Sequence, residues 1–155
     1  MNILVVDDEK EIADVVELYL QNEYHVLKFY TGQEALECIE KTNVDLAILE
    51  NVGNLVCPAE FDTGASKNVM ILSVPEGHDK PLKYPLMFQI CDAVLINKID
   101  VLPYFDFDLE RVKENYRGVN PGAPLFAVSA RSEEGLDALC AHLRERFVQL
   151  LDETR

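Results

Sequence analysis

The sequence predicts a three-layer α/β domain, in which helices cover both faces of a parallel sheet of about six strands. Short apolar runs rich in β-branched residues alternate along the chain with segments in which apolar residues recur at helical spacing. Polar residues follow several of these runs directly, and ligands on parallel sheets bind at the carboxyl ends of the strands. With 155 residues, of which 48% are hydrophobic, we expect a single domain over residues 1–155 with a substantial core.

Strands are expected at the apolar runs over residues 2–6, 25–30, 44–49, 69–74, 93–96 and 125–128. The helices between them are expected to end near residue 22, to begin at residue 31, and to cover residues 81–90, 106–119 and about 134–151. Thr31 and Glu34 have the spacing of a capping box, and Pro85 predicts a kink or break. Acidic residues in the first turn of the helix at 106–119 favour the helix dipole.

The charge of the chain argues against a nucleic-acid partner. The formal net charge is −14, whereas a protein that binds nucleic acid needs a basic face. The longest apolar runs are far shorter than the roughly 20 residues that span a bilayer, so no membrane partner is expected either. Residues 1–50 carry 12 acidic and 3 basic side chains, and residues 51–155 carry 16 and 11, so the charge density changes near residue 50.

The cysteines indicate reduced thiols and a cytoplasmic protein, because no pair has C-x-x-C spacing and the chain opens on a strand without a secretory signal. They are Cys38, Cys57, Cys91 and Cys140. The histidines are scattered singly, so structural or solvated roles are expected for His25, His78 and His142.

Acidic residues follow the first and third expected strands. Asp7 and Asp8 come after the first and Glu50 after the third, which makes a candidate Mg²⁺ site of oxygen ligands; the alternative is solvated strand ends. Residues 1–49, with I-L-V-V-D-D-E-K-E-I, T-G-Q-E-A-L and V-D-L-A-I-L, resemble the receiver domain of response regulators of the vancomycin-resistance type. The resemblance implies metal binding by Asp7 and Asp8. It places Glu50 where the family has its phosphorylated Asp, so phosphoryl transfer is not expected.

Polar loops also follow the fifth and sixth expected strands. The letters N-K-I-D have the N-K-x-D spacing of a GTPase, in which the Asp accepts two hydrogen bonds from guanine, the Asn contacts the ring and the Lys stem covers the base. The letters S-A-R match the S-A-x loop that supports the base. N-K-x-D alone arises by chance fairly often, but both loops in this order are a specific signal. The predicted guanine-binding residues are Asn97, Lys98, Asp100, Ser129 and Ala130.

Residues 50–147 resemble the nickel-insertion GTPases of hydrogenase maturation, on the segments E-N-V-G-N-L-V-C-P and E-G-x-D-K-P-L-K-Y-P together with N-K-I-D. The resemblance implies a switch that senses the γ-phosphate at Glu50, Asn51 and Gly53. It also implies nickel or zinc ligation by Cys57. That family pairs this cysteine with a Cys-His pair that has no counterpart here, so the metal site is incomplete.

The phosphate loop of such GTPases, G-x-x-x-x-G-K-[ST], does not occur in the sequence. Asp7 and Asp8 follow the first strand, where that loop belongs, and their carboxylates would repel a triphosphate. We therefore expect no GTP hydrolysis, no enzymatic activity and no required cofactor, with Mg²⁺ as a candidate ion.

Two resemblances that both stop near residue 50 lead to the interpretation that the chain is an engineered chimera without an evolved activity, with a receiver-derived half at 1–49 and a GTPase-derived half at 50–155. For this flavodoxin-like and P-loop-like hybrid we favour the strand order 2-1-3-4-5-6 over 2-3-1-4-5-6. One alternative is a residual binder of Mg²⁺, nickel or zinc, or guanine nucleotide. The other is a phosphorelay protein in which Glu50 mimics the charged state. No partner is certain, and a monomer or weak homodimer is expected.

Overall fold

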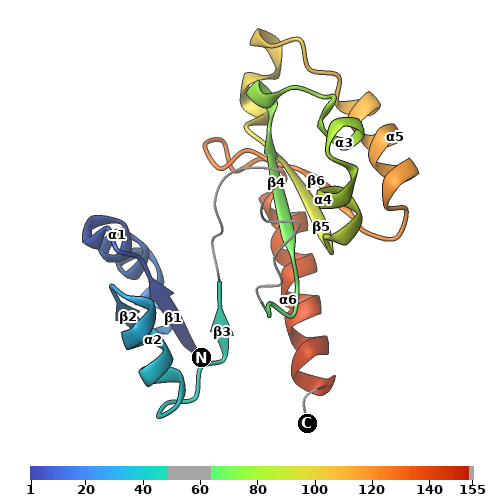
Figure 1. The fold of residues 1–155 in the computed structure, drawn as a ribbon. Helices are drawn as coiled ribbons and strands as arrows, with labels where there is room; N and C mark the ends of the chain where they lie inside the picture. Colours follow the sequence, from blue (N-terminus) through green and yellow to red (C-terminus); the bar gives the residue numbers. More distant parts are fainter. Residues whose placement is uncertain (49–63, 154–155) are drawn as a thin grey trace. The chain divides into compact units, whose positions relative to one another are not determined.

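The computed structural model describes residues 1–48 and 64–153, with side chains up to residue 150. The chain divides into two compact units, Met1–Asn51 and Val52–Arg155, and each is described by itself (Figure 1). The organisation of residues 1–155 as one domain stays a prediction.

The first unit is a parallel sheet of three strands with two helices among its described residues. Its elements are β1 (Asn2–Val6), α1 (Lys10–Leu20), β2 (His25–Phe29), α2 (Gly32–Ile39) and β3 (Leu46–Ala47). The strands lie in the order β2-β1-β3, with Leu4 of β1 between Leu27 of β2 and Ala47 of β3. The central position of β1 explains why its residues Ile3 and Leu4 are buried.

The helix α2 begins as its capping signal predicts. The Thr31 hydroxyl accepts a hydrogen bond from the backbone N–H of Glu34 at 3.3 Å. The Glu34 carboxylate accepts from the backbone N–H of Tyr30 at 3.2 Å, one residue before the position that a capping box uses. Both bonds satisfy donors that would otherwise lack partners at the start of the helix.

The second unit contains a parallel sheet in the order β4-β5-β6. Its described elements are β4 (Val69–Ser73), η2 (Val74–Glu76), α3 (Lys80–Lys83), α4 (Pro85–Ile90), β5 (Ala93–Asn97), η3 (Ile99–Tyr104), α5 (Leu109–Val119), β6 (Leu125–Ala127) and α6 (Leu136–Glu153). In register, Ile96 of β5 lies between Leu72 of β4 and Ala127 of β6.

Helices cover both faces of this second sheet. The core on one face joins alternate strand residues to residues of α4 and α5: Met70, Leu72, Val94, Ile96, Phe88, Val112 and Tyr116. On the other face Phe126 of β6 contacts His142 of α6, with ring centroids 5.2 Å apart. Figure 1 shows α3, α4 and α5 grouped on one side of the strands, and α6 away from these three helices. This layering confirms the predicted α/β class with parallel strands.

The strand pairing is divided between two sheets of three in the described residues, where we expected one sheet of about six. The partial orders 2-1-3 and 4-5-6 both agree with the favoured order. Among the described residues, only Leu46 and Ala47 pair with β1, so β3 is two residues long there. The expected strand covered residues 44–49, of which residue 49 lies outside the described range.

Proline and left-handed residues set the helix boundaries in the second unit. Pro85 is the first residue of α4 and separates it from α3, which confirms the predicted break. The helix α5 begins at Leu109 and not at 106, because the Asp108 carboxylate caps it by accepting from the Arg111 N–H at 2.9 Å. The helix α6 begins after Gly135, whose φ of 76° is not helical.

Asn120, which follows α5, closes the end of α4. Its side-chain amide donates to the backbone carbonyls of Phe88, Gln89 and Cys91 at 3.0 to 3.2 Å. These carbonyls have no partner within the helix, so one side chain joins the ends of α4 and α5. In the described part of the chain, no helix combines the length and the apolar character needed to cross a membrane.

Candidate functional site

The carboxyl end of β5 turns sharply at Lys98. This residue has φ 64° and ψ 38°, in the left-handed region, and it leads from β5 directly into η3. Its backbone N–H donates to the side-chain oxygen of Asn97 at 2.8 Å. A non-glycine residue in this conformation costs roughly 1–2 kcal/mol, and such strain collects at functional sites. The turn leaves the Lys98 side chain exposed.

The carboxyl end of β6 is tied to this turn through the backbone. The N–H of Val128 donates to the carbonyl of Ile96 at 2.8 Å, and the N–H of Ile99 donates to the carbonyl of Val128 at 3.2 Å. The next residue, Ser129, is 0% exposed. The parallel pairing of β5 and β6 therefore brings both predicted loops to one edge of the sheet.

Ser129 joins the two loops through its hydroxyl. The Ser129 Oγ donates to Asp100 Oδ1 at 2.7 Å and accepts from the backbone N–H of Ser132 at 3.1 Å. The Asp100 side chain is half-buried, and its Oδ1 is bonded to the buried Ser129 hydroxyl. An ionised carboxylate has about four acceptor positions, so it can accept further donors while it holds this bond.

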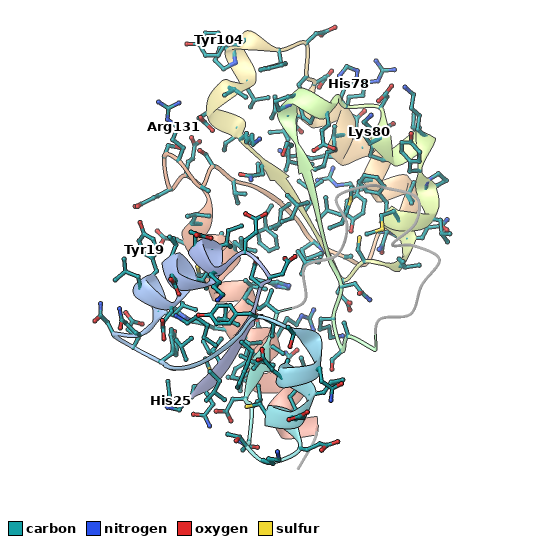
Figure 2. The ribbon with its side chains drawn as sticks, turned by 60° about the vertical axis from the view of Figure 1, so that its left-hand side comes forward. Tyr19, His25, His78, Lys80, Tyr104 and Arg131 are labelled. Atoms are coloured by element: carbon teal, nitrogen blue, oxygen red, sulfur yellow. The ribbon has the colours of Figure 1, made fainter. Side chains whose placement is uncertain are left out.

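The predicted guanine-binding residues thus lie together. Asn97, Lys98 and Asp100 come from the loop after β5, and Ser129 and Ala130 come from the loop after β6. Ala130 is exposed, and Figure 2 shows the side chain of the next residue, Arg131, pointing outward from the loop. Their part in binding guanine stays a prediction.

Sequence reasoning missed Gly135, at the end of the second loop. Its φ is 76°, and a Cβ built on it would lie 2.2 Å from the carbonyl oxygen of Ala127. The glycine six residues after Ser129, the first residue of the S-A-R motif, was the available signal, but its meaning depends on a contact between the loop and β6.

The predicted Mg²⁺ ligands are only partly described. Asp7 is half-buried after β1, and its Oδ1 accepts from the backbone N–H of Glu9 at 2.9 Å, while Asp8 is exposed. Glu50 lies outside the described residues. Within residues 1–48 and 64–153, no three His, Cys, Asp or Glu side chains form a group that could hold a metal ion. The Mg²⁺ site stays a prediction.

The predicted switch residues Asn51 and Gly53 and the predicted nickel ligand Cys57 also lie outside the described residues. Of the other cysteines, Cys91 is buried, and its Sγ donates to the carbonyl of Phe88 at 3.2 Å. Burial raises the pKa of the Cys91 thiol, which is the state of a structural cysteine.

A parallel α/β unit whose polar loops meet at the carboxyl ends of neighbouring strands is the architecture of a nucleotide-binding domain. The family model of the CobW/HypB/UreG nucleotide-binding domain matches residues 9–127. The chain belongs to this family.

The similar proteins are hydrogenase maturation factors. The chain is 50% identical over 117 residues to the hydrogenase maturation factor HypB of Azotobacter chroococcum mcd 1, a match that covers 75% of this chain and 38% of that protein. It is 50% identical over 106 residues to the hydrogenase/urease maturation factor HypB of Helicobacter hepaticus, covering 68% of this chain and 44% of that protein. The chain thus spans less than half the length of these curated relatives.

A solved relative has the same fold. The crystal structure of HypB from Helicobacter pylori in complex with nickel aligns with a TM-score of 0.76 at 32% identity, covering 96% of this chain and 74% of that one. Because that relative binds nickel, the comparison does not support the expectation that no cofactor is required.

The family match overturns the interpretation of an engineered chimera without activity. One family model runs from residue 9 to residue 127, across residue 50, where we placed a junction. These similarities give no support for a segment derived from a receiver domain. The difference in charge density across residue 50 is therefore a property of one nucleotide-binding chain.

The prediction that the chain is not an enzyme is wrong as well, because the chain belongs to a family of nucleotide-binding domains. That prediction rested on the missing phosphate loop and on the carboxylates of Asp7 and Asp8 after the first strand. The family match contradicts it.

Proposed function

We propose that this chain recognises guanine nucleotides and acts in GTP-dependent nickel delivery during hydrogenase maturation. The observation that carries the proposal is the 2.7 Å hydrogen bond from the buried Ser129 hydroxyl to Asp100. It joins the two loops that the sequence assigns to the base, and family membership and the HypB relatives support the same function.

The chemistry of the two loops suits guanine. The Asp100 carboxylate accepts from N1–H and the 2-amino group of the base, which are adjacent donors on one edge. Adenine presents an acceptor at N1, so the same carboxylate disfavours it. The Asn97 amide contacts the ring, the Lys98 stem covers its face, and the loop at Ala130 supports it.

Metal ions enter this function in two ways. Asp7, Asp8 and Glu50 supply oxygen ligands, which suit Mg²⁺, although the two described aspartates do not complete a site by themselves. Nickel is the cargo, and Cys57 supplies a thiolate, a ligand that soft transition metals prefer. The sequence contains no G-x-x-x-x-G-K-[ST] motif, so we assign no residue to the phosphates.

We also propose a cytoplasmic protein that is a monomer or a weak homodimer and has neither a nucleic-acid nor a membrane partner. The net charge of −14 supports the exclusion of nucleic acid, and the similarity to hydrogenase maturation factors supports the cytoplasm.

The test is a titration of the chain with GDP and ADP, followed by fluorescence or calorimetry, on the wild type and on Asp100→Asn. GDP is expected to bind more tightly than ADP. In Asp100→Asn the preference is expected to shift from GDP to xanthosine diphosphate, because the asparagine amide donates to the 2-oxo group of xanthine. Asp92→Asn is the matched control, since Asp92 precedes β5 at its opposite end and binds Lys67 at 3.0 Å.

Equal binding of GDP and ADP by the wild type would contradict the proposal. So would an Asp100→Asn variant that keeps the wild-type preference for GDP.

A further inference from the structure

Gly135 closes the loop that carries Ser129 and Ala130. The loop returns to β6 at this residue, and the backbone of Gly135 lies directly against the backbone of Ala127. A Cβ at Gly135 would meet the carbonyl oxygen of Ala127 at 2.2 Å, its carbonyl carbon at 3.2 Å and Val128 Cγ1 at 3.3 Å. Since real Cβ atoms essentially never come within 3.0 Å of another heavy atom, a side chain here requires a shift of about 0.8 Å.

The strand cannot supply that shift. Val128 is 3% exposed, its N–H is bonded to Ile96 of the central strand, and its carbonyl is bonded to Ile99. Gly135 has φ 76°, so an L-residue is also disfavoured there by its own backbone. The displacement therefore falls on the segments that flank Gly135, of which the 130–134 loop is the one bonded to Ser129.

That loop makes two hydrogen bonds with Ser129. The N–H of Ser129 donates to the carbonyl of Glu134 at 2.9 Å, and the N–H of Ser132 donates to Ser129 Oγ at 3.1 Å. The same Ser129 Oγ donates to Asp100 Oδ1. A loop that moves away from Ser129 loses the donor that orients this hydroxyl, and the Asp100 carboxylate then loses its fixed direction.

We infer that Gly135 is a positioning residue for guanine selectivity, because the contact between its backbone and Ala127 sets the position of the 130–134 loop, and that loop orients Asp100 through Ser129. Gly135 acts through these residues and does not touch the base. The inference rests on the proposed guanine recognition.

The experiment compares GDP with inosine diphosphate, which lacks the 2-amino group, in the wild type and in Gly135→Ala. In the wild type, a well-placed Asp100 is expected to favour GDP by about tenfold or more. In Gly135→Ala that ratio is expected to fall toward one. Gly118→Ala is the control, because Gly118 lies in α5 and an added Cβ would meet nothing within 4 Å beyond its chain neighbours and the backbone of its own helix.

The ratio separates positioning from stability. A variant that is only partly folded binds both nucleotides more weakly by the same factor, so their ratio does not change. A ratio in Gly135→Ala equal to that of the wild type would overturn the inference while leaving the proposed function intact. A wild-type ratio near one would contradict the guanine recognition itself, and the inference with it.

Hydrogen exchange on the wild type tests the same loop if Gly135→Ala does not fold. The Ser132 amide, held by a buried hydroxyl, is expected to exchange at least about a hundredfold more slowly than an unstructured peptide. Exchange at the unstructured rate would overturn the inference, because a mobile loop cannot orient Ser129.

Discussion

Removal of the Ser129 hydroxyl tests the contact on which the candidate site depends. In Ser129→Ala the Asp100 carboxylate loses a hydrogen bond of 2.7 Å, and the Ser132 N–H loses its acceptor. A hydrogen bond to an ionised group contributes about 1.5–3 kcal/mol. Asp100 is half-buried and Ser132 is exposed, so both regain water, and we expect the lower end of this range. The free energy of unfolding is expected to fall by about 1.5 kcal/mol.

The binding of GDP is expected to weaken by about tenfold in the same variant, because the carboxylate is no longer held in one direction before the base arrives. Urea unfolding measures the stability, and a GDP titration measures the affinity. Ser132→Ala is the control, since its backbone N–H, which makes the hydrogen bond, remains in place.

A double-mutant cycle on stability combines Ser129→Ala with Asp100→Ala. If the two side chains interact as the structure shows, their effects differ from additivity by about 1 kcal/mol or more. Effects that add within about 0.5 kcal/mol, together with an unchanged GDP affinity in Ser129→Ala, would refute the reasoning.

Two further predictions rest on described residues, and a third concerns Cys57, which lies outside them. Lys98→Gly relieves the left-handed strain, so we expect it to be about 1 kcal/mol more stable than Lys98→Ala in urea, while both lose GDP affinity with the lysine stem; equal stability would count against the strain. Burial raises the pKa of Cys91 above 9.0 and that of Tyr116 above 10.0, so the stability they give is complete below pH 9 and declines as the pH rises through these values. Unfolding curves at pH 8 to 11 check this, and Tyr116→Phe is expected to decline less steeply; an identical decline would disprove the assignment. Cys57→Ser is expected to weaken nickel binding in calorimetry, whereas Cys140→Ser, at an exposed thiol of α6, leaves it unchanged; equal losses in both would remove Cys57 from the site.

Local patterns in the sequence were sufficient for most elements of the fold. The strands at residues 2–6 and 93–96 are observed within one residue, because their apolar runs are long and bounded by polar residues. The division of the strands into two sheets could not be predicted, since pairing depends on tertiary contacts and not on any one segment. The short helix η3 was missed because Pro103 obscures its helical pattern.

The site shows the same division between local and tertiary information. Asn97, Asp100 and Ser129 were recognised from motif spacing, and the pairing of β5 with β6 then brought them together. Gly135 was missed, because only the packing of its backbone against Ala127 gives that glycine a role. The chimera interpretation failed for a related reason: two local similarities were taken as two origins, although one family model spans both.

The backbone bonds that link Ile96, Val128 and Ile99 also bear on the thermodynamics of ligand capture. They hold the loops after β5 and β6 together before any ligand binds, so the proposed guanine site is expected to lose little conformational entropy on binding. Affinity at the proposed site is expected to depend on the match between hydrogen-bond donors and acceptors. Binding is expected to show a small heat-capacity change and little ordering of the two loops. In a related chain without those backbone hydrogen bonds, the two loops would have to become ordered when the ligand binds.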